Sequence, residues 1–122
     1  MAEAQRWRSL AKCKQKNIPS FTTEAEFVTG CLGPPQPAFL NIAGREQTLA
    51  KRIQRVCLDK GVTPLSVVFP GACASEADAD YASCLDGRIA CRFCLAAVVA
   101  DDVTTPLDCD LLDDGASNGS CP

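Results

Sequence analysis

The sequence contains no histidine. Histidine is the side chain whose ordinary pKa lies nearest neutral pH, and it is also the commonest metal ligand and a frequent general acid or base. Its absence excludes Ser-His and Cys-His catalytic arrangements and leaves acid–base catalysis to carboxylates. No pair of carboxylates is distinguished by its position, and no glycine-rich phosphate loop is present. We therefore predict that the protein is not an enzyme.

Aromatic residues and long apolar runs are also scarce. Aromatic residues make up 6% of the chain, although apolar residues make up 47%. A core of small aliphatic side chains buries little area per residue and gains little from the hydrophobic effect. No apolar run approaches the ~18 residues of a membrane span, and the run at 95–100 is far too short. The first twenty residues carry five Lys or Arg, which does not fit a signal peptide, so we expect an exported chain to be a mature form.

Cysteine, in contrast, is abundant. Nine cysteines occur in 122 residues, and all nine are disulfide candidates: Cys13, Cys31, Cys57, Cys73, Cys84, Cys91, Cys94, Cys109 and Cys121. Cysteine at this density indicates a disulfide framework or a set of metal ligands. Because cytosolic thiols are kept reduced, a disulfide framework predicts a location in the medium, at the cell surface or in a periplasm.

A metal or redox site is the alternative use of these cysteines. Cys91 and Cys94 form a C-x-x-C, but zinc needs two further ligands, and only Cys84 and Cys109 lie near in the sequence. Leu95 follows the motif, where a c-type haem site requires histidine. A redox C-x-x-C opens a helix, where the helix dipole lowers the thiol pKa, whereas this one falls inside a predicted helix. We therefore predict no metal and no cofactor.

The helical positions of three cysteines limit their pairing. In a straight helix Cys84 and Cys91 stand about 10 Å apart, which is too far for a disulfide. Cys91 and Cys94 are badly oriented for each other. We expect all three to reach other segments, with Cys109 and Cys121 of the tail as partners.

The remaining cysteines suggest two further pairs. Cys13 with Cys31 would join the first two helices, and Cys57 with Cys73 would clip the following loop onto the third helix. The connectivity is not determined by the sequence, and an odd count leaves one cysteine free or paired with another chain.

Hydrophobic periodicity predicts an all-α fold. The expected helices cover residues 3–16, about two turns after Thr23, residues 42–60 and residues 76–100. Only Val67-Val68-Phe69 has the composition of a strand, and a proline lies close to it on each side. We predict a single domain, 1–122, forming a small irregular disulfide-stapled bundle of three to four helices with an irregular, acidic, loop-like tail, 101–122.

Helix ends and buried faces are also predicted. Thr23 and Glu26 form a capping-box pattern, Asn41 and Ser75 are expected N-caps, and Gly61 fits a left-handed C-cap. Glu76, Asp78 and Asp80 would then lie in the first turns of the last helix, where its dipole favours them. The expected inner stripes are Leu49, Ile53, Val56 and Cys57 on the third helix, and Tyr81, Cys84, Leu85, Cys91, Leu95 and Val98 on the last.

Charge is divided unevenly along the chain. Residues 1–60 contain ten basic and five acidic residues, whereas residues 61–122 contain two basic and ten acidic residues. The halves can neutralise each other within one molecule, or opposite-charge ends can associate head to tail between molecules. We expect protein partners, including self-association of this kind. The basic face of 45–60 belongs to an acidic chain of export type, so we predict no nucleic-acid partner.

The acidic tail offers two weaker motifs. Oxygen ligands for calcium are present at Asp108, Asp110, Asp113, Asp114, Gly115 and Asn118, but they do not follow the EF-hand spacing, and a solvated loop is favoured. Residues 118–120, Asn-Gly-Ser, form a glycosylation sequon that matters only in a eukaryotic secretory host.

Two stretches carry a family resemblance: "IAGREQTLAKRIQRVCLDKGVTPLSVVFPGAC" and "YASCLDGRIACRFCLAAVVADDV". The basic helix ending in Arg55-Val56-Cys57, the Phe-Pro-Gly-Ala-Cys turn at 69–73 and the C-x-x-C at 91–94 resemble exported, cysteine-rich helical proteins of myxobacteria and related bacteria. That group has no established function. The resemblance implies export and a helical build, and it supplies no catalytic residues.

Two functional hypotheses remain. The first is a non-enzymatic exported structural or interaction protein, for example a subunit of an extracellular or cell-surface assembly or filament. The second is a metal- or cofactor-binding protein that uses cysteine thiolates. The number of free thiols distinguishes them.

Overall fold

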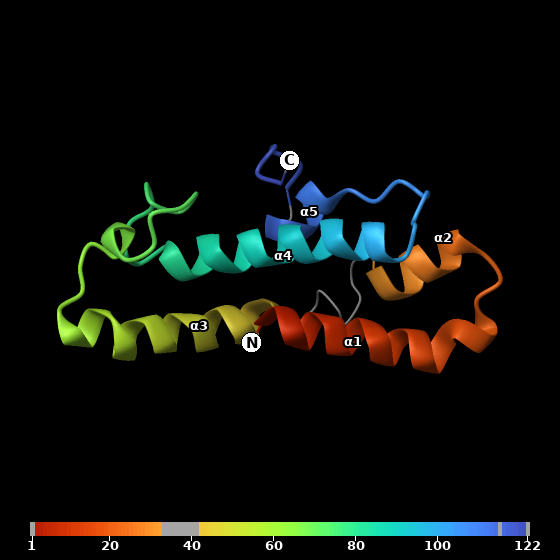
Figure 1. The fold of residues 1–122 in the computed structure, drawn as a ribbon, viewed down its shortest axis with the longest axis horizontal. Helices are drawn as coiled ribbons and strands as arrows, with labels where there is room; N and C mark the ends of the chain where they lie inside the picture. The colour runs from red at the N-terminus through yellow and green to blue at the C-terminus, as the bar shows by residue number, and fades with distance from the viewer. Residues whose placement is uncertain (1, 33–41, 115, 122) are drawn as a thin grey trace. The chain divides into compact units, whose positions relative to one another are not determined.

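The computed structural model describes residues 2–32, 42–114 and 116–121, and its regular structure is helical (Figure 1). The α-helices are α1 (Ala2–Asn17), α2 (Glu24–Phe27), α3 (Ile42–Val56), α4 (Tyr81–Ala100) and α5 (Cys109–Asp114). Tighter or wider helical turns join them at Ile18–Ser20, Val28–Leu32, Leu58–Lys60 and Leu65–Val67. The described residues contain no strand, so the predicted all-α, disulfide-stapled class is confirmed.

The chain divides into two compact units. Unit 1 comprises Met1–Asn41 and Arg88–Pro122, and unit 2 comprises Ile42–Gly87. Unit 1 contains seven basic and nine acidic residues, and unit 2 contains five and six. Each unit thus combines a basic helix with an acidic segment. The strong charge difference between the two halves of the sequence almost disappears between the folded units, which favours neutralisation within each unit.

Unit 1 is built around the second half of α4. Phe93 is fully buried there, and its ring meets the edge of Trp7 from α1 at a centroid distance of 5.0 Å. Leu10 of α1 and Val28 of the turn after α2 complete this core with the buried alanine and cysteine positions of α4. Aromatic residues are few, but one edge-to-face pair lies at the centre of this unit.

The capping box before α2 is confirmed. The Thr23 hydroxyl accepts from the Glu26 amide at 3.2 Å, and the Glu26 carboxylate accepts from the Thr23 amide at 3.2 Å. The helix then widens into the π turn Val28–Leu32. A side chain at Gly30 would lie 2.7 Å from the Phe21 ring, so glycine allows this turn to pack closely on the ring. The predicted two-turn helix is therefore present, with its second turn in π form.

Unit 2 has a small core under α3. Ile53, Leu65 and Tyr81 are its large buried members, and Leu49 and Cys57 pack against them at its edge. The Tyr81 hydroxyl donates to the Phe69 carbonyl at 2.6 Å. Gly61, with φ of 76°, ends the helical turn after α3 in the predicted left-handed cap. The predicted Asn41 cap lies outside the described residues.

The predicted start of the last helix is wrong. α4 begins at Tyr81, and residues 71–80 form turns instead of helix. The Asp78 carboxylate accepts from the Leu65 amide at 2.8 Å and from the Thr63 hydroxyl at 2.6 Å. These hydrogen bonds to a distant segment hold 71–80 over the core of unit 2, so Ser75 does not cap the helix. Tertiary bonding here outweighs a favourable local capping pattern.

Two predicted core residues are at the surface. Val56 on α3 is 69% exposed and Leu95 on α4 is 40% exposed. On α4 the buried positions of unit 1 are instead Ala90, Phe93 and Ala97, together with the disulfide cysteines. The tail is also less irregular than predicted, because α5 forms within it.

Candidate interaction surface

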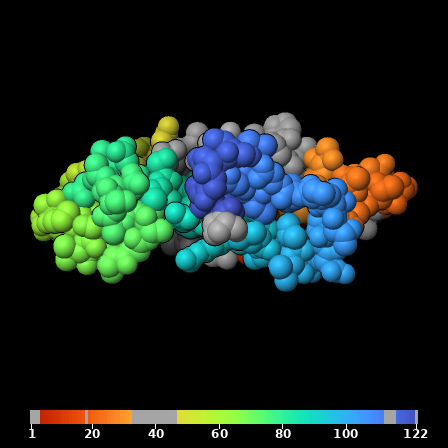
Figure 2. Space-filling view, turned by 90° about the horizontal axis from the view of Figure 1, so that it is seen from above, coloured from red at the N-terminus to blue at the C-terminus, as the bar shows by residue number. Residues whose placement is uncertain are grey.

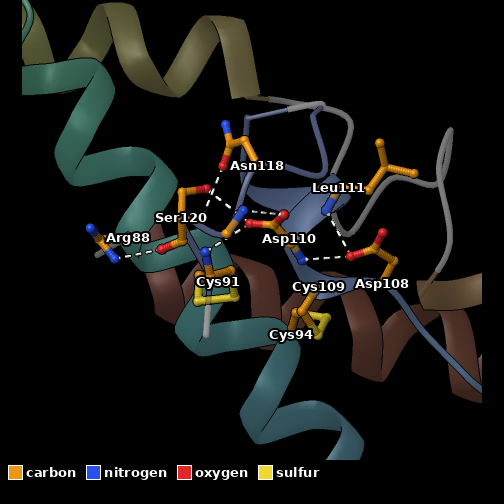
Figure 3. Close-up of a disulfide and its surroundings, with 11 residues drawn as sticks. Arg88, Cys91, Cys94, Asp108, Cys109, Asp110, Leu111, Asn118 and Ser120 are labelled. Carbon is orange, nitrogen blue, oxygen red and sulfur yellow. Dashed lines mark hydrogen bonds between the residues drawn. A yellow bond between two sulfur atoms is a disulfide. The ribbon is translucent and has the colours of Figure 1, made fainter.

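Three disulfides staple unit 1. They are Cys13–Cys31, Cys91–Cys121 and Cys94–Cys109, with Cα–Cα distances of 5.8, 5.5 and 5.6 Å. The predicted Cys13–Cys31 pair is confirmed, as is the pairing of both tail cysteines with cysteines of α4. Figure 3 shows the two tail disulfides one turn apart on α4, so the C-terminal segment is held to that helix at two points.

The predicted Cys57–Cys73 pair is wrong. Cys73 bonds to Cys84 in the first turns of α4, with a Cα–Cα distance of 5.9 Å. The turns at 71–80 fold back over the start of α4 and bring Cys73 to that helix. Cys57 is the free cysteine, half-buried and packed against the same core. Eight of the nine sulfurs are thus oxidised, and a single thiol is left for any other chemistry.

The acidic tail binds backbone amides. The Asp108 carboxylate accepts from the Asp110 and Leu111 amides, each at 3.1 Å, and so caps α5. The Asp110 carboxylate accepts from the amides of Gly119 at 2.8 Å and Cys121 at 2.9 Å (Figure 3). Hydrogen bonds to the charged form lower the pKa of both carboxyl groups. These carboxylates therefore serve as structural clamps.

The tail residues weighed as calcium ligands, for which a solvated loop is favoured, do not converge in the described part of the tail. No group of three or more Cys, Asp or Glu side chains is placed to hold a metal ion among the described residues. The side chains of Asp113 and Asp114, and Gly115 itself, lie outside what the structure describes. Asn118 of the sequon is exposed, and its side-chain oxygen accepts from the Ser120 amide at 2.9 Å.

Two further carboxylates hold the segment after α4. Glu24 at the start of α2 accepts from the amides of Thr104 and Thr105 and from the Thr104 hydroxyl. The bond from the Thr105 amide is the main reason that the pKa of Glu24 falls from 4.5 to about 2. Lys14 of α1 forms an ion pair with Asp101. Unit 1 is therefore tied by polar clamps as well as by disulfides.

Unit 2 exposes a run of apolar side chains. Val67 is 75% exposed, Val68 47% and Phe69 37%, and Val56 at the end of α3 is 69% exposed. The turn that carries the run packs on the core through Leu65, in the same cluster as Ile53 of α3. Only one residue of this turn reaches the core, so the valines that follow it face solvent. Four of the seven large exposed hydrophobic residues of the described chain thus lie in 56–69.

Unit 2 also exposes basic side chains on α3 and on the turn that follows it. Lys51, Arg52, Arg55 and Lys60 are all exposed. Arg52 precedes Val56 by one helical turn, so the two side chains share one flank of α3. We define the unit 2 surface as the exposed apolar residues 56 and 67–69 with these four basic residues. The basic helix and the apolar run are each recognisable in the sequence, but periodicity predicts Val56 in the core.

The described helices include none that combines the length and apolar character needed to cross a membrane. Comparison with known proteins gives no match to a protein-family model, to a curated protein or to a solved structure. The resemblance to exported cysteine-rich proteins therefore stays a prediction.

Proposed function

We propose that the protein is a non-enzymatic exported interaction protein that serves as a subunit of an extracellular or cell-surface assembly. Four disulfides indicate an oxidising environment of the extracellular type. The observation that carries the proposal is the unit 2 surface. Its apolar centre is three consecutive exposed residues, Val67, Val68 and Phe69. Exposed apolar patches with polar residues around them mark interaction sites.

The chemistry of the unit 2 surface defines the partner it suits. Burial of an apolar side chain such as Val67 or Val68 contributes about 1.5–3 kcal/mol when it is complete. The exposed basic residues of the same unit, Lys51, Arg52, Arg55 and Lys60, favour carboxylates on the partner and repel basic surfaces. The expected partner is therefore an acidic protein surface with apolar residues at its centre. Opposite charge remains the basis of association, and its source within the basic half of the sequence is these four residues.

The thiolate hypothesis has little support in this structure. A metal site built from cysteine needs several thiolates, because structural zinc takes four ligands. Cys57 is the one thiol outside the disulfides. One cysteine with no histidine in the chain does not supply such a ligand set.

Zero-length cross-linking in the culture that produces the protein tests the proposal. A carbodiimide joins a lysine to a carboxylate only when the two are in contact. We expect Lys51 and Lys60 to cross-link to carboxylates of another chain, with yields that fall at high salt. The exposed Lys12 and Lys16 of α1 lie outside the unit 2 surface and serve as internal controls.

A matched pair of variants completes the test. Val67→Ser with Val68→Ser removes the exposed apolar side chains, and Ala72→Ser with Ala74→Ser changes two exposed positions nearby. The first variant should lose the Lys51 and Lys60 cross-links, and the second should keep them. Equal cross-linking of Lys12 and Lys51, or cross-links confined to one chain, would contradict the proposal.

A further inference from the structure

The second half of α4 has an exposed face in unit 1. Val99 is 81% exposed and Leu95 40% exposed, and Arg92, Ala96 and Ala100 are exposed beside them. Figure 2 shows atoms of this part of the chain, in cyan to light blue, at the molecular surface next to the darker C-terminal segment.

This face is separate from the faces that α4 uses for its own fold. Ala90, Phe93 and Ala97 are fully buried on the opposite side, and Cys94 is fully buried by its disulfide to the tail. Arg92, Leu95 and Val99 follow one another at spacings of three and four, so they form one stripe along the helix. The stripe is apolar at its centre, and the core of unit 1 does not use it.

Asp102 follows Val99 by three residues and lies just beyond the end of the helix. It is exposed, with φ of 50°, and its amide donates to the Val99 carbonyl at 3.3 Å. The Val103 amide donates to the Val98 carbonyl at 3.0 Å, which completes a helix C-cap with Asp102 at the left-handed position. Glycine is the usual residue there, so this cap places a carboxylate where most caps carry no side chain.

The stripe is complementary to itself when its direction is reversed. In order along the chain it presents Arg92, Leu95, Val99 and Asp102, separated by three, four and three residues. Reversal exchanges the basic end for the acidic end and Leu95 for Val99. A parallel pairing would instead place arginine near arginine and aspartate near aspartate, which is unfavourable.

We propose that a second copy of this chain docks on the stripe in an antiparallel arrangement about a two-fold axis. Leu95 of each copy packs on Val99 of the other, and Arg92 of each copy lies against Asp102 of the other. Such an interface uses the same patch on both subunits and closes as a dimer. The small side chain of Ala96 beside the stripe permits close approach of the two helices.

The size of the stripe sets the strength of this dimer. One short helix face falls at the low end of specific protein interfaces, which bury ~800 Å² per partner. The dimer is therefore concentration-dependent and dissociates on dilution. The dimer interface contains no residue of the unit 2 surface, so either proposal can fail without affecting the other.

Sedimentation equilibrium of the full chain over a range of concentrations tests the inference. We expect a monomer–dimer equilibrium, and Leu95→Glu should abolish the dimer. Arg92→Asp and Asp102→Arg should each weaken dimerisation about tenfold, because each reversal creates two like-charge contacts across the axis. Arg8→Asp, at an exposed position of α1, makes the same change of charge away from the stripe and should have no effect.

Recombining the charge reversals tests the antiparallel arrangement itself. The double variant, Arg92→Asp with Asp102→Arg, restores both opposite-charge contacts and should recover the dimer. A mixture of the Arg92→Asp chain and the Asp102→Arg chain should form a heterodimer in preference to either homodimer. A monomer at every concentration, a dimer that survives Leu95→Glu, or reversals that act no more strongly than Arg8→Asp would overturn the inference.

The unit 2 variants serve as a further control. Val67→Ser with Val68→Ser should leave the α4 dimer unchanged and remove only the cross-links of the unit 2 surface. Loss of dimerisation in that variant would assign self-association to the unit 2 surface and would also overturn the inference. Circular dichroism of each variant checks that the helices are retained.

Discussion

Unit 1 and unit 2 are held together in different ways. Unit 1 contains three disulfides, which tie other segments to α1 or α4. The Glu24 clamp ties the segment after α4 to α2, and the Asp108 and Asp110 clamps act within the tail. Unit 2 contains one disulfide, between residues 11 apart, and a small core of which Ile53, Leu65 and Tyr81 are the large members. The free cysteine and the most exposed apolar turn also belong to unit 2.

This difference distinguishes the unit that covalent links stabilise from the unit that exposes most of the large apolar side chains. Covalent links restrict the unfolded chain of unit 1, so this unit tolerates an apolar stripe left outside its core. Unit 2 depends more on side-chain packing, so a change of one buried residue should affect it more strongly. We expect unit 2 to open first, with amide protons that exchange faster than those of unit 1.

Reduction of the disulfides should have the largest effect on this comparison. Each disulfide contributes about 2–4 kcal/mol to the free energy of unfolding. Loss of three in unit 1 is comparable with the ~5–15 kcal/mol that stabilise a typical domain. We expect dithiothreitol to remove most of the helical circular-dichroism signal and the slow hydrogen exchange of unit 1. A unit 1 that stays protected after full reduction would show that packing alone holds it.

Leu65→Ala should be the next largest perturbation. Leu65 is fully buried in unit 2, and truncation of a buried leucine typically lowers the free energy of unfolding by about 2–5 kcal/mol. Val67→Ala, two residues away at a 75% exposed position, is the matched control and should have little effect. Hydrogen exchange measured by mass spectrometry should show faster exchange in 42–87 alone. Equal loss of protection in unit 1 would mean that the units unfold as one.

Tyr81→Phe should have a moderate effect on unit 2. The variant keeps the buried ring and loses the hydrogen bond from the hydroxyl to the Phe69 carbonyl at 2.6 Å. A bond of this kind contributes about 0.5–1.5 kcal/mol. The change should appear as a lower urea midpoint when unfolding is monitored by far-ultraviolet circular dichroism. An unchanged midpoint would show that the packed ring, and not the hydroxyl, holds the turn at 69.

Glu24→Gln should have the smallest effect, and that effect should depend on pH. The pKa of Glu24 is lowered from 4.5 to about 2 because the Thr105 and Thr104 groups donate to its charged form. A carboxyl group whose pKa is lowered by folding stabilises the fold at every pH above its pKa in the unfolded chain. This stabilisation is lost as the pH falls toward about 2, the pKa in the folded state. The variant should therefore melt below the native chain at pH 7 and approach it in acid. Glu76→Gln, at an exposed position of unit 2, should show no such trend.

Much of the local structure could be predicted from the sequence because its causes are local. The Thr23–Glu26 capping box and the Gly61 cap each depend on a few adjacent residues, and both are present. The Cys13–Cys31 pair joins consecutive helical segments only 18 residues apart, so the short connection limited the alternatives.

The errors share a different cause. Ser75 and its acidic neighbours form a good local cap, but Asp78 binds the Leu65 amide across 13 residues and keeps that segment in turns. Cys57 was expected to bond to Cys73, but the same turns carry Cys73 to Cys84. Leu95 was placed inside because a leucine on a helical stripe is usually buried. The candidate surfaces were missed because periodicity shows that a helix has an apolar face, not which face a neighbour covers.

The amino-acid sequence by itself predicted the helical class and favoured a disulfide framework, and its nine cysteines allow at most four bridges within one chain with one cysteine remaining. These follow from composition, residue counts and short-range patterns. Only the tertiary structure decided that Cys57 is the remaining thiol, that charge is balanced within each unit, and that Arg92, Leu95, Val99 and Asp102 face outward. Those outcomes depend on which distant segments compete for the same core positions and hydrogen-bond partners. A local sequence pattern does not indicate which segment is buried or bonded in the end.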